Sequence, residues 1–193
     1  MDNGAFSYWK AGKQADWSGY YDWAAHWLRH PACDWAVIPD VIGGTETEND
    51  DLIEQWPHGD RGVPVWHLDE SIDRLVRMAA RWPRIALGSA AAFDARSPSK
   101  CVNRLRHALR SVSDDDGYPL VKLHGLRMLN PKIVTAVPLA SADSTNVAHN
   151  IGLDVAWQGP YCPKTRETRT DVLIERIEAH QSPPRMDHRG AGA

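Results

Sequence analysis

Cysteine is scarce in this chain of 193 residues, and the three cysteines that it contains are far apart. Because Cys33, Cys101 and Cys162 include no closely spaced pair, the sequence indicates neither a disulfide framework nor a cysteine-rich zinc site. We expect these thiols to be buried and reduced, which fits a cytoplasmic protein.

Long apolar runs and an excess of positive charge are also missing. No stretch approaches the ~18 apolar residues of a membrane-spanning helix, and the first residues lack a signal-peptide pattern, so we expect no membrane contact. The formal net charge of −3 argues against a protein that coats nucleic acid, although a local basic patch is compatible with it. The phosphate-binding motifs GxGxxG and GxxxxGK[ST] do not follow any apolar run.

Composition is otherwise that of an ordinary globular domain. Hydrophobic residues make up 42% of the chain and charged residues 24%, enough for one sizeable core. We assign residues 1–180 to a single domain. Residues 181–193 contain proline, glycine and charge without an apolar period, so we expect a disordered tail there.

A repeated unit organises the chain, in which a short apolar run is followed by a polar, amphipathic stretch. The runs are largely continuous, as in strands that are buried on both faces. Their alternation with helical patterns predicts βαβ units and a parallel sheet. The predicted strands lie in residues 34–40, 63–69, 84–89, 119–125 and 138–143, and the predicted helices in residues 19–30, 70–82, 99–112 and 168–180.

Two architectures fit this pattern. Residues 1–7 look like a loop that follows a further strand, which gives about six units, whereas a TIM barrel has eight. An open doubly wound sheet is the other choice, but the nucleotide-binding signature typical of that fold is absent. We therefore expect an α/β fold of the (β/α)8 TIM-barrel type, incomplete because its first two strands are missing.

Polar residues stand at the end of every predicted strand. Because the carboxyl ends of parallel strands share one rim, we expect a candidate site there. His67, His124, Asp40 and Asp143 are ligand types that also fit a metal-dependent hydrolase. The acidic stretch 45–51 is expected to be a solvated loop. The strand-end residues are Asp40, His67, Asp69, Gly88, Ser89, His124, Gly125 and Asp143.

Taken in order, the strand-end motifs resemble those of the tRNA-guanine transglycosylases. "DNGAFS" (2–7) resembles "DSGGFQ", and "AVIPDVI" (36–42) resembles the strand that ends in that family's second active-site aspartate. "IALGSA" (85–90) takes the place of "GGLAVGE", and "KLHGLR" (122–127) that of "YLMGVG". "LASADSTNVAHN" (139–150) resembles the nucleophile strand "MFDCVMPTRNAR". The residues of these motifs are closest to those of the divergent relatives of phages and bacteria, among them DNA-acting 7-deazaguanine transglycosylases.

The resemblance implies a role for each matching carboxylate. Asp143 is the expected nucleophile, which attacks the anomeric carbon, displaces guanine and forms a covalent glycosyl-enzyme. Asp2 is the expected general acid/base, and Asp40 the acceptor for the N–H edge of the base. This division suits the chemistry, since an oxocarbenium-like centre needs a carboxylate and a poor leaving group needs a second carboxyl in another protonation state. The remaining expected substrate-binding residues are Gly88, Ser89, His124, Gly125 and His67.

Nucleic acid and a 7-deazaguanine base are the implied partners. The target base must leave its stack to reach the rim. We expect phosphate contacts from the basic cluster Lys164, Arg166 and Arg169. The family's zinc-binding cysteines have no counterpart, so we expect no structural zinc and no cofactor. Because the first two barrel strands also lack a counterpart, the implied alternatives are completion by a second copy or partner subunit, or an inactive relative that still binds base or nucleic acid.

Overall fold

The described strands of this protein all pair in parallel. The computed structural model describes residues 3–12, 15–93, 97–144, 151 and 163–186. Pairing runs β1–β2 in one short sheet and β3–β4–β5–β6 in another, and only Pro64 separates β2 from β3. The strands are β1 (Ala36–Val37), β2 (Gly62–Val63), β3 (Val65–His67), β4 (Arg84–Gly88), β5 (Lys122–Gly125) and β6 (Ser141–Ala142).

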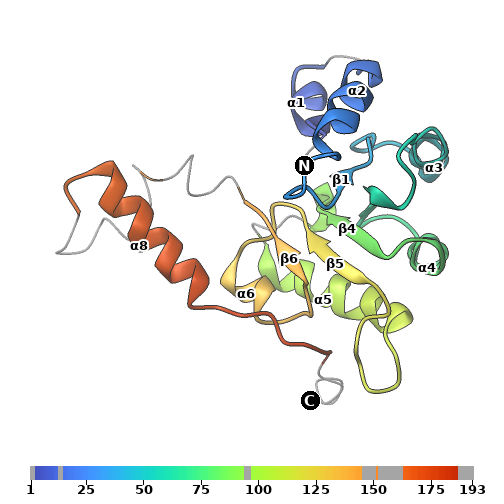
Figure 1. Cartoon of the computed structure of the whole chain (residues 1–193). Coiled ribbons are helices and arrows are strands. Elements are labelled where there is room, and N and C mark those ends of the chain that lie inside the picture. The colour runs from blue at the N-terminus through green and yellow to red at the C-terminus, as the bar shows by residue number, and fades with distance from the viewer. Residues whose placement is uncertain (1–2, 13–14, 94–96, 145–150, 152–162, 187–193) are drawn as a thin grey trace.

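Helices alternate with these strands along the chain. Figure 1 shows α2 to α5 in an arc around the strands, whereas α8 extends away from them. The helices are α1 (Ala5–Lys10), α2 (Ser18–Trp27), α3 (Glu46–Glu54), α4 (Ile72–Arg81), α5 (Pro98–Leu109), α6 (Pro131–Val134) and α8 (Arg166–Glu178). Among the described helices, none is long and apolar enough to cross a bilayer.

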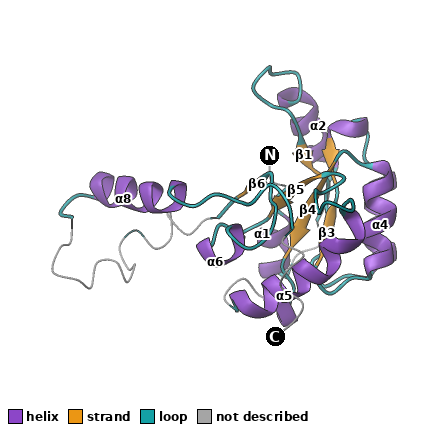
Figure 2. Cartoon of the chain, turned by 90° about the horizontal axis from the view of Figure 1, so that it is seen from below, coloured by secondary structure: helices purple, strands orange, loops and turns teal. Residues whose placement is uncertain are grey.

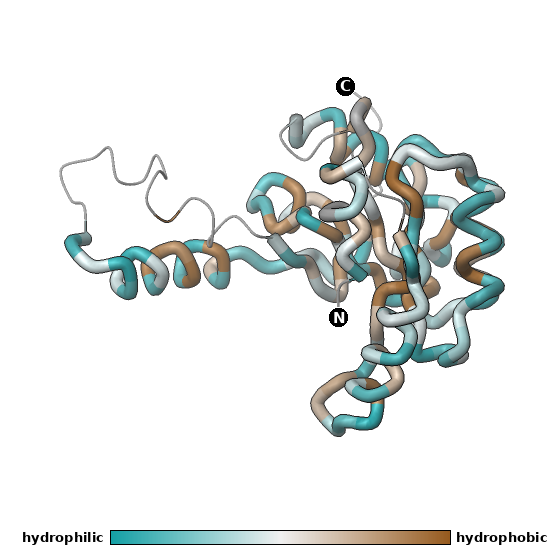
Figure 3. The backbone as a smooth tube through the Cα atoms, turned by 90° about the horizontal axis from the view of Figure 1, so that it is seen from above, coloured by the Kyte–Doolittle hydropathy of each residue, from teal (hydrophilic) through white to brown (hydrophobic). Residues whose placement is uncertain are grey.

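The two faces of the sheet are packed differently. Side chains from one face, such as Trp66, Ile85 and Leu123, join the apolar sides of the helices in one large cluster. This cluster includes Leu75 of α4 and Leu105 of α5. The opposite face buries a separate small cluster of Val37, Val63, Val65 and Ala86. Helices α4 and α5 therefore pack on one face of the sheet, as can be followed in Figure 2. Figure 3 shows hydrophobic and hydrophilic residues alternating along the extended helix α8.

The α/β class with parallel strands is thereby confirmed. Strand order β3–β4–β5–β6 follows the chain order without reversal, so these strands have no switch point of the doubly wound kind. The described strands form an open arrangement and not a closed barrel. The described residues therefore show the expected α/β class, but they do not show a TIM-type barrel.

The acidic stretch 45–51 is not a loop, which corrects the sequence prediction. It forms most of α3, whose first turn carries a capping box between Thr45 and Glu48. Asn49 and Ile53 face inward and are buried, so the helix has an inner side despite its charge. Local capping and two inward residues outweighed the low hydrophobicity on which the loop prediction rested.

The first residues of the predicted tail pack against the domain. Ser182 Oγ accepts the N–H of Leu139 at 2.8 Å and lies 2.6 Å from the carbonyl oxygen of Val137. The N–H of Met186 donates to Gly117 O at 2.8 Å, and the Met186 side chain is buried. Residues 181–186 therefore extend the packed region past residue 180, and residues 187–193 lie outside the described part of the chain.

Met186→Ala is expected to lower the free energy of unfolding by about 2 kcal/mol or more, because truncating a buried methionine removes apolar contacts and leaves a cavity. Urea denaturation of the full chain measures this loss. Leu120→Ala is the matched control, since Leu120 is 65% exposed and its truncation is expected to change stability by less than about 0.5 kcal/mol. Equal effects of the two substitutions would contradict the packed position of residue 186.

Candidate functional site

Two groups of polar side chains stand at the carboxyl ends of the strands. The first, here named the His67 group, comprises Asn3, Asp40, His67, Glu70 and Arg74. The second, the His124 group, comprises His124, Arg127, Ser141 and Asp143. Each group is centred on a histidine that lies on the face opposite the helix layer, so the parallel register brings both to the same edge.

His67 lies between two carboxylates. Its Nε2 is 3.1 Å from Asp40 Oδ2, and its Nδ1 is 3.4 Å from Glu70 Oε1. The backbone N–H of His67 also donates to Glu70 Oε2 at 2.8 Å. All three side chains are buried. Because a carboxylate only accepts hydrogen bonds, an imidazole that meets one on each side is best satisfied as the cation.

The charges around His67 shift its pKa strongly. Burial alone would lower the pKa of His67, but hydrogen bonds and charge attraction from Asp40 and Glu70 outweigh burial and raise the pKa from 6.5 to about 9. Burial would likewise raise the pKa of Glu70, yet His67 and Arg74 hold it below its usual value. The His67 group is thus a buried cluster in which cation and carboxylates stabilise one another.

Asn3 and Arg74 each bind one of the two carboxylates beside His67. Asn3 Nδ2 donates to Asp40 Oδ1 at 2.8 Å and to Ile38 O at 2.9 Å, which fixes the first loop to the end of β1. Arg74 donates to Glu70 Oε2 at 2.6 Å and to Asp50 Oδ1 at 2.7 Å. The carboxylate of Asp40 is therefore oriented through both of its oxygens.

This arrangement predicts a pH dependence of stability. Since the folded pKa of His67 is above the unfolded value, its contribution is complete below pH 6.5 and is lost as the pH rises through about 9. The loss corresponds to roughly 3 kcal/mol, because one pKa unit is about 1.4 kcal/mol. Urea denaturation at pH 6 and pH 9.5 is expected to show a stability gap between the wild type and His67→Gln that narrows at the higher pH. A gap that stays constant over this range would contradict the cationic state of His67.

The His124 group surrounds the carboxylate of Asp143. Asp143 Oδ1 accepts the backbone N–H of Arg127 at 2.6 Å, and Oδ2 is 3.3 Å from His124 Nε2. The other ring nitrogen of His124 lies 2.8 Å from Ser141 Oγ. His124 is buried and its ring meets the edge of Trp35 at a centroid distance of 4.9 Å, whereas the Asp143 side chain is half-exposed.

These contacts keep Asp143 ionised. Partial burial would raise its pKa, but the hydrogen bonds and positive charge of His124 and Arg127 hold it below the usual value. Arg127 has a φ of 56°, the left-handed region, and in this conformation its N–H points at the carboxylate. Asp143 is therefore an oriented, accessible carboxylate, which is the state that a nucleophile requires.

The other predicted residues fall in different places. Asp2 lies outside the described residues, directly before Asn3. A Cβ at Gly88 would stand 2.8 Å from His67 Cδ2, so this glycine makes room for the imidazole; Ser89 follows it and is partly buried. A Cβ at Gly125 would meet Met128 Cβ at 2.9 Å.

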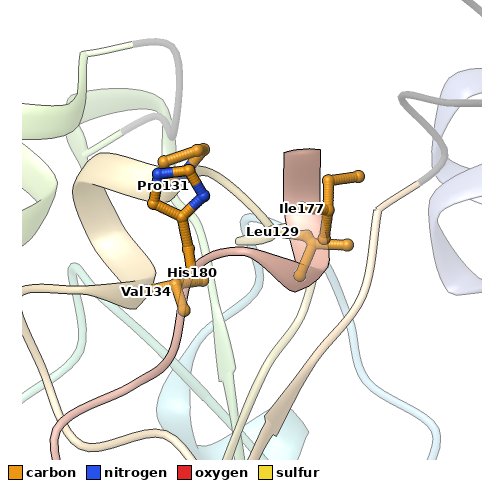
Figure 4. Close-up of a pocket in the computed structure, with 5 residues that line it drawn as sticks. All are labelled: Leu129, Pro131, Val134, Ile177 and His180. Atoms are coloured by element: carbon orange, nitrogen blue, oxygen red, sulfur yellow. The ribbon is translucent and has the colours of Figure 1, made fainter. Parts of the chain in front are cut away.

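The predicted basic cluster is not brought together with these groups. Lys164 and Arg166 are exposed at the start of α8, and Arg169 donates to Pro163 O at 2.8 Å. In Figures 1 and 2, α8 extends away from the strands. Figure 4 shows a small pocket between α6 and α8, lined by Leu129, Pro131, Val134, Ile177 and His180. The pocket contains none of the predicted site residues, although the N–H of Leu129 donates to the backbone oxygen of Asp143 at 3.0 Å.

Sequence reasoning missed several members of both groups. The sequence points to Asp69, but this residue is exposed, and its neighbour Glu70 is the buried partner of His67. Ser141 was also missed. It stands two residues before Asp143, and the period of two along a strand places both side chains on the same face, which is a usable signal. Nothing in the sequence indicated Asn3 or Arg74.

The described residues contain no group of three or more His, Cys, Asp or Glu side chains arranged to hold a metal ion. Fold and site together define an α/β protein with two histidine–carboxylate groups at the carboxyl ends of parallel strands. Comparison of the chain with protein-family models, with curated proteins and with solved structures yields no match.

Proposed function

We propose that this protein is a transglycosylase-like enzyme that exchanges guanine for a 7-deazaguanine base in DNA or tRNA through a covalent Asp-glycosyl intermediate. The observation that carries the proposal is Asp143, a half-exposed carboxylate after β6 whose two oxygens are oriented by the Arg127 N–H and by His124. The ordered strand-end motifs of residues 2–150 supply the reaction type by resemblance.

The proposed exchange takes place in two steps, in which guanine leaves first and the incoming base then takes its place. In the first, an Asp143 oxygen bonds to the sugar C1′ while the C1′–N9 bond to guanine breaks, and the departing base takes a proton from the Asp2 carboxyl. In the second, the incoming base gives its N9 proton to the Asp2 carboxylate and bonds to C1′, which releases Asp143. The anchoring of Asn3 to Asp40 supports this assignment, because it fixes the residue next to Asp2 beside the end of β1.

Asp40 suits recognition of a base edge. Two of the roughly four lone-pair positions of its carboxylate accept hydrogen bonds from Asn3 and His67. His67 Nε2 holds Asp40 Oδ2 at 3.1 Å, and the lone-pair positions that remain are acceptors for N–H groups of guanine or a 7-deazaguanine. Gly88 contributes by leaving space for the His67 ring, and Ser89 and Gly125 complete this edge.

The fold is proposed to be part of a TIM-type barrel. Consecutive parallel strands, a layer of helices packed on one face and polar groups at the carboxyl ends are what a barrel segment has. The inner face carries the small cluster around Val65 and Ala86. A second copy or a partner subunit is the proposed completion of this face, and Lys164, Arg166 and Arg169 remain the proposed phosphate contacts.

Base exchange tests the proposal directly. The full chain is incubated with guanine-containing single-stranded DNA, duplex DNA or tRNA together with a labelled 7-deazaguanine base. Incorporation of label into one nucleic acid, with release of one guanine for each label, is the expected result and also identifies the substrate. An oligonucleotide that lacks guanine is the control, and it is expected to incorporate no label. Absence of both label incorporation and guanine release with all three nucleic acids would contradict the proposed function.

A further inference from the structure

The environment of Asp143 contains a hydrogen-bonded chain that the exchange reaction does not by itself require. Ser141, His124 and Asp143 follow one another at 2.8 Å and 3.3 Å. Ser141 and His124 are direct partners in the pairing of β5 with β6. We propose that His124 and Ser141 are positioning residues that orient the carboxylate of Asp143; the inference rests on the proposed role of Asp143 as nucleophile.

The chemistry of the three groups fixes the direction of the hydrogen bonds. An ionised carboxylate only accepts, so His124 Nε2 carries the hydrogen that faces Asp143 Oδ2. Ser141 Oγ then faces Nδ1, and a hydroxyl can donate to a neutral imidazole or accept from a cationic one. Ser141 therefore holds the ring in the orientation that serves Asp143 in either protonation state.

Packing holds the chain of hydrogen bonds in place. The His124 ring is buried against the edge of Trp35, and Ser141 enters from the neighbouring strand on the same face of the sheet. The other oxygen of Asp143 is held by a backbone N–H, which a side-chain substitution at Arg127 leaves in place. His124 is thus the side chain that donates to Asp143, and its hydrogen bond helps to hold the pKa of this carboxylate below its usual value.

Orientation and charge matter most when the glycosyl-enzyme breaks down. Asp143 loses its negative charge when its oxygen bonds to C1′ and regains it when that bond breaks. Donors that are already aimed at the carboxylate stabilise the returning charge without reorganisation. We therefore expect substitutions of His124 or Ser141 to lower kcat with little change in KM. The same substitutions are expected to shift the acid side of the pH–rate profile to higher pH.

The same order of residues also fits a different chemistry, in which Ser141 is the nucleophile and His124 its base. In that case Asp143 only orients the imidazole. The two possibilities predict different covalent products: a glycosyl group on Asp143 in the first, and a phosphonyl group on Ser141 after a fluorophosphonate probe in the second. Labelling at Ser141 would overturn the positioning role.

The test uses the full chain with His124→Ala, His124→Gln and Ser141→Ala. His124→Ala is expected to lower kcat about 10-fold to 100-fold, as for loss of a hydrogen bond to a charged group, and to shift the acid side of the kcat/KM profile to higher pH. His124→Gln, whose amide N–H can replace Nε2, is expected to restore part of the rate. Ser113→Ala is the matched control, since the Ser113 hydroxyl donates to Leu109 O at a helix end and belongs to neither histidine group. A lower kcat with an unmoved profile would mean a merely structural role and would overturn the inference.

Nitrogen-15 NMR of the imidazoles separates this inference from the proposed function. In the wild type, His124 Nε2 is expected to carry its hydrogen, and Ser141→Ala is expected to change the Nδ1 signal while the protein stays folded. A hydrogen on Nδ1 alone, or no change in Ser141→Ala, would contradict the inference. A wild type that exchanges no base removes the proposed function, and the NMR result then decides the arrangement of this chain of hydrogen bonds.

Discussion

Asp143→Asn is expected to reduce base exchange by about a thousandfold or more, because an amide cannot form the glycosyl ester. Asp143 is half-exposed and its backbone lies at the end of β6, so the substitution is expected to leave the fold intact. The amide oxygen still accepts the Arg127 N–H, which preserves the local hydrogen bond. Initial rates of label incorporation, with circular dichroism for the fold, measure the effect.

Asp69→Asn is the matched control for this substitution. Asp69 also follows a strand and is exposed, but it belongs to neither histidine group. Its replacement is expected to change the exchange rate less than about twofold, as for a surface position away from the site. Retention of more than a tenth of the wild-type rate in Asp143→Asn, with Asp143→Ala equally active, would contradict the nucleophile assignment.

Arg74→Ala is expected to destabilise the fold by about 3 to 5 kcal/mol, because the buried carboxylate of Glu70 loses the guanidinium that donates to it. Arg74 is 1% exposed and hydrogen-bonds Glu70, Asp50 and the carbonyl of Val65. Glu70 also contacts His67, which in turn contacts Asp40, so removal of Arg74 is expected to disturb the orientation of Asp40 as well. Urea or thermal denaturation of the full chain measures the change.

Arg77→Ala provides the comparison on the same helix. Arg77 is 60% exposed and lies 3.8 Å from Asp50, so it shares a partner with Arg74 without being buried. Solvent screens such a pair, and we expect a change below about 0.5 kcal/mol. Similar losses of stability for the two arginine substitutions would show that the His67 group does not depend on a buried cation.

The double variant Arg74→Met with Glu70→Gln is expected to recover part of the stability that Arg74→Ala loses, since it removes both buried charges.

The strands were predictable because burial on both faces leaves a plain trace in the sequence. The runs that contain Val65, Ile85 and Leu123 are largely apolar, and each contains a parallel strand. The rim position of His67 and His124 followed from the same reasoning, because parallel strands deliver their carboxyl ends to one edge. Whether the strands close into a barrel depends on pairing between distant strands, which apolar runs do not encode.

The partners within the site were less predictable because they come from distant parts of the chain. Asn3 and Asp40 are 37 positions apart, and their hydrogen bond depends on how the first loop returns to the end of β1. Arg74 reads as a solvated charge on a helix, yet it is buried because Glu70 and Asp50 neutralise it. Charged residues that pair inside a fold look the same in sequence as charged residues in water.

Mapping of a covalent adduct tests the central claim most directly. The full chain is incubated with a guanine-containing oligonucleotide in the absence of an incoming base, denatured, digested and examined by mass spectrometry. We expect a glycosyl-linked nucleotide adduct on the peptide that contains Asp143, absent from Asp143→Asn and present in Asp69→Asn. Active exchange with no adduct at Asp143, or with an adduct on another residue, would contradict the central claim.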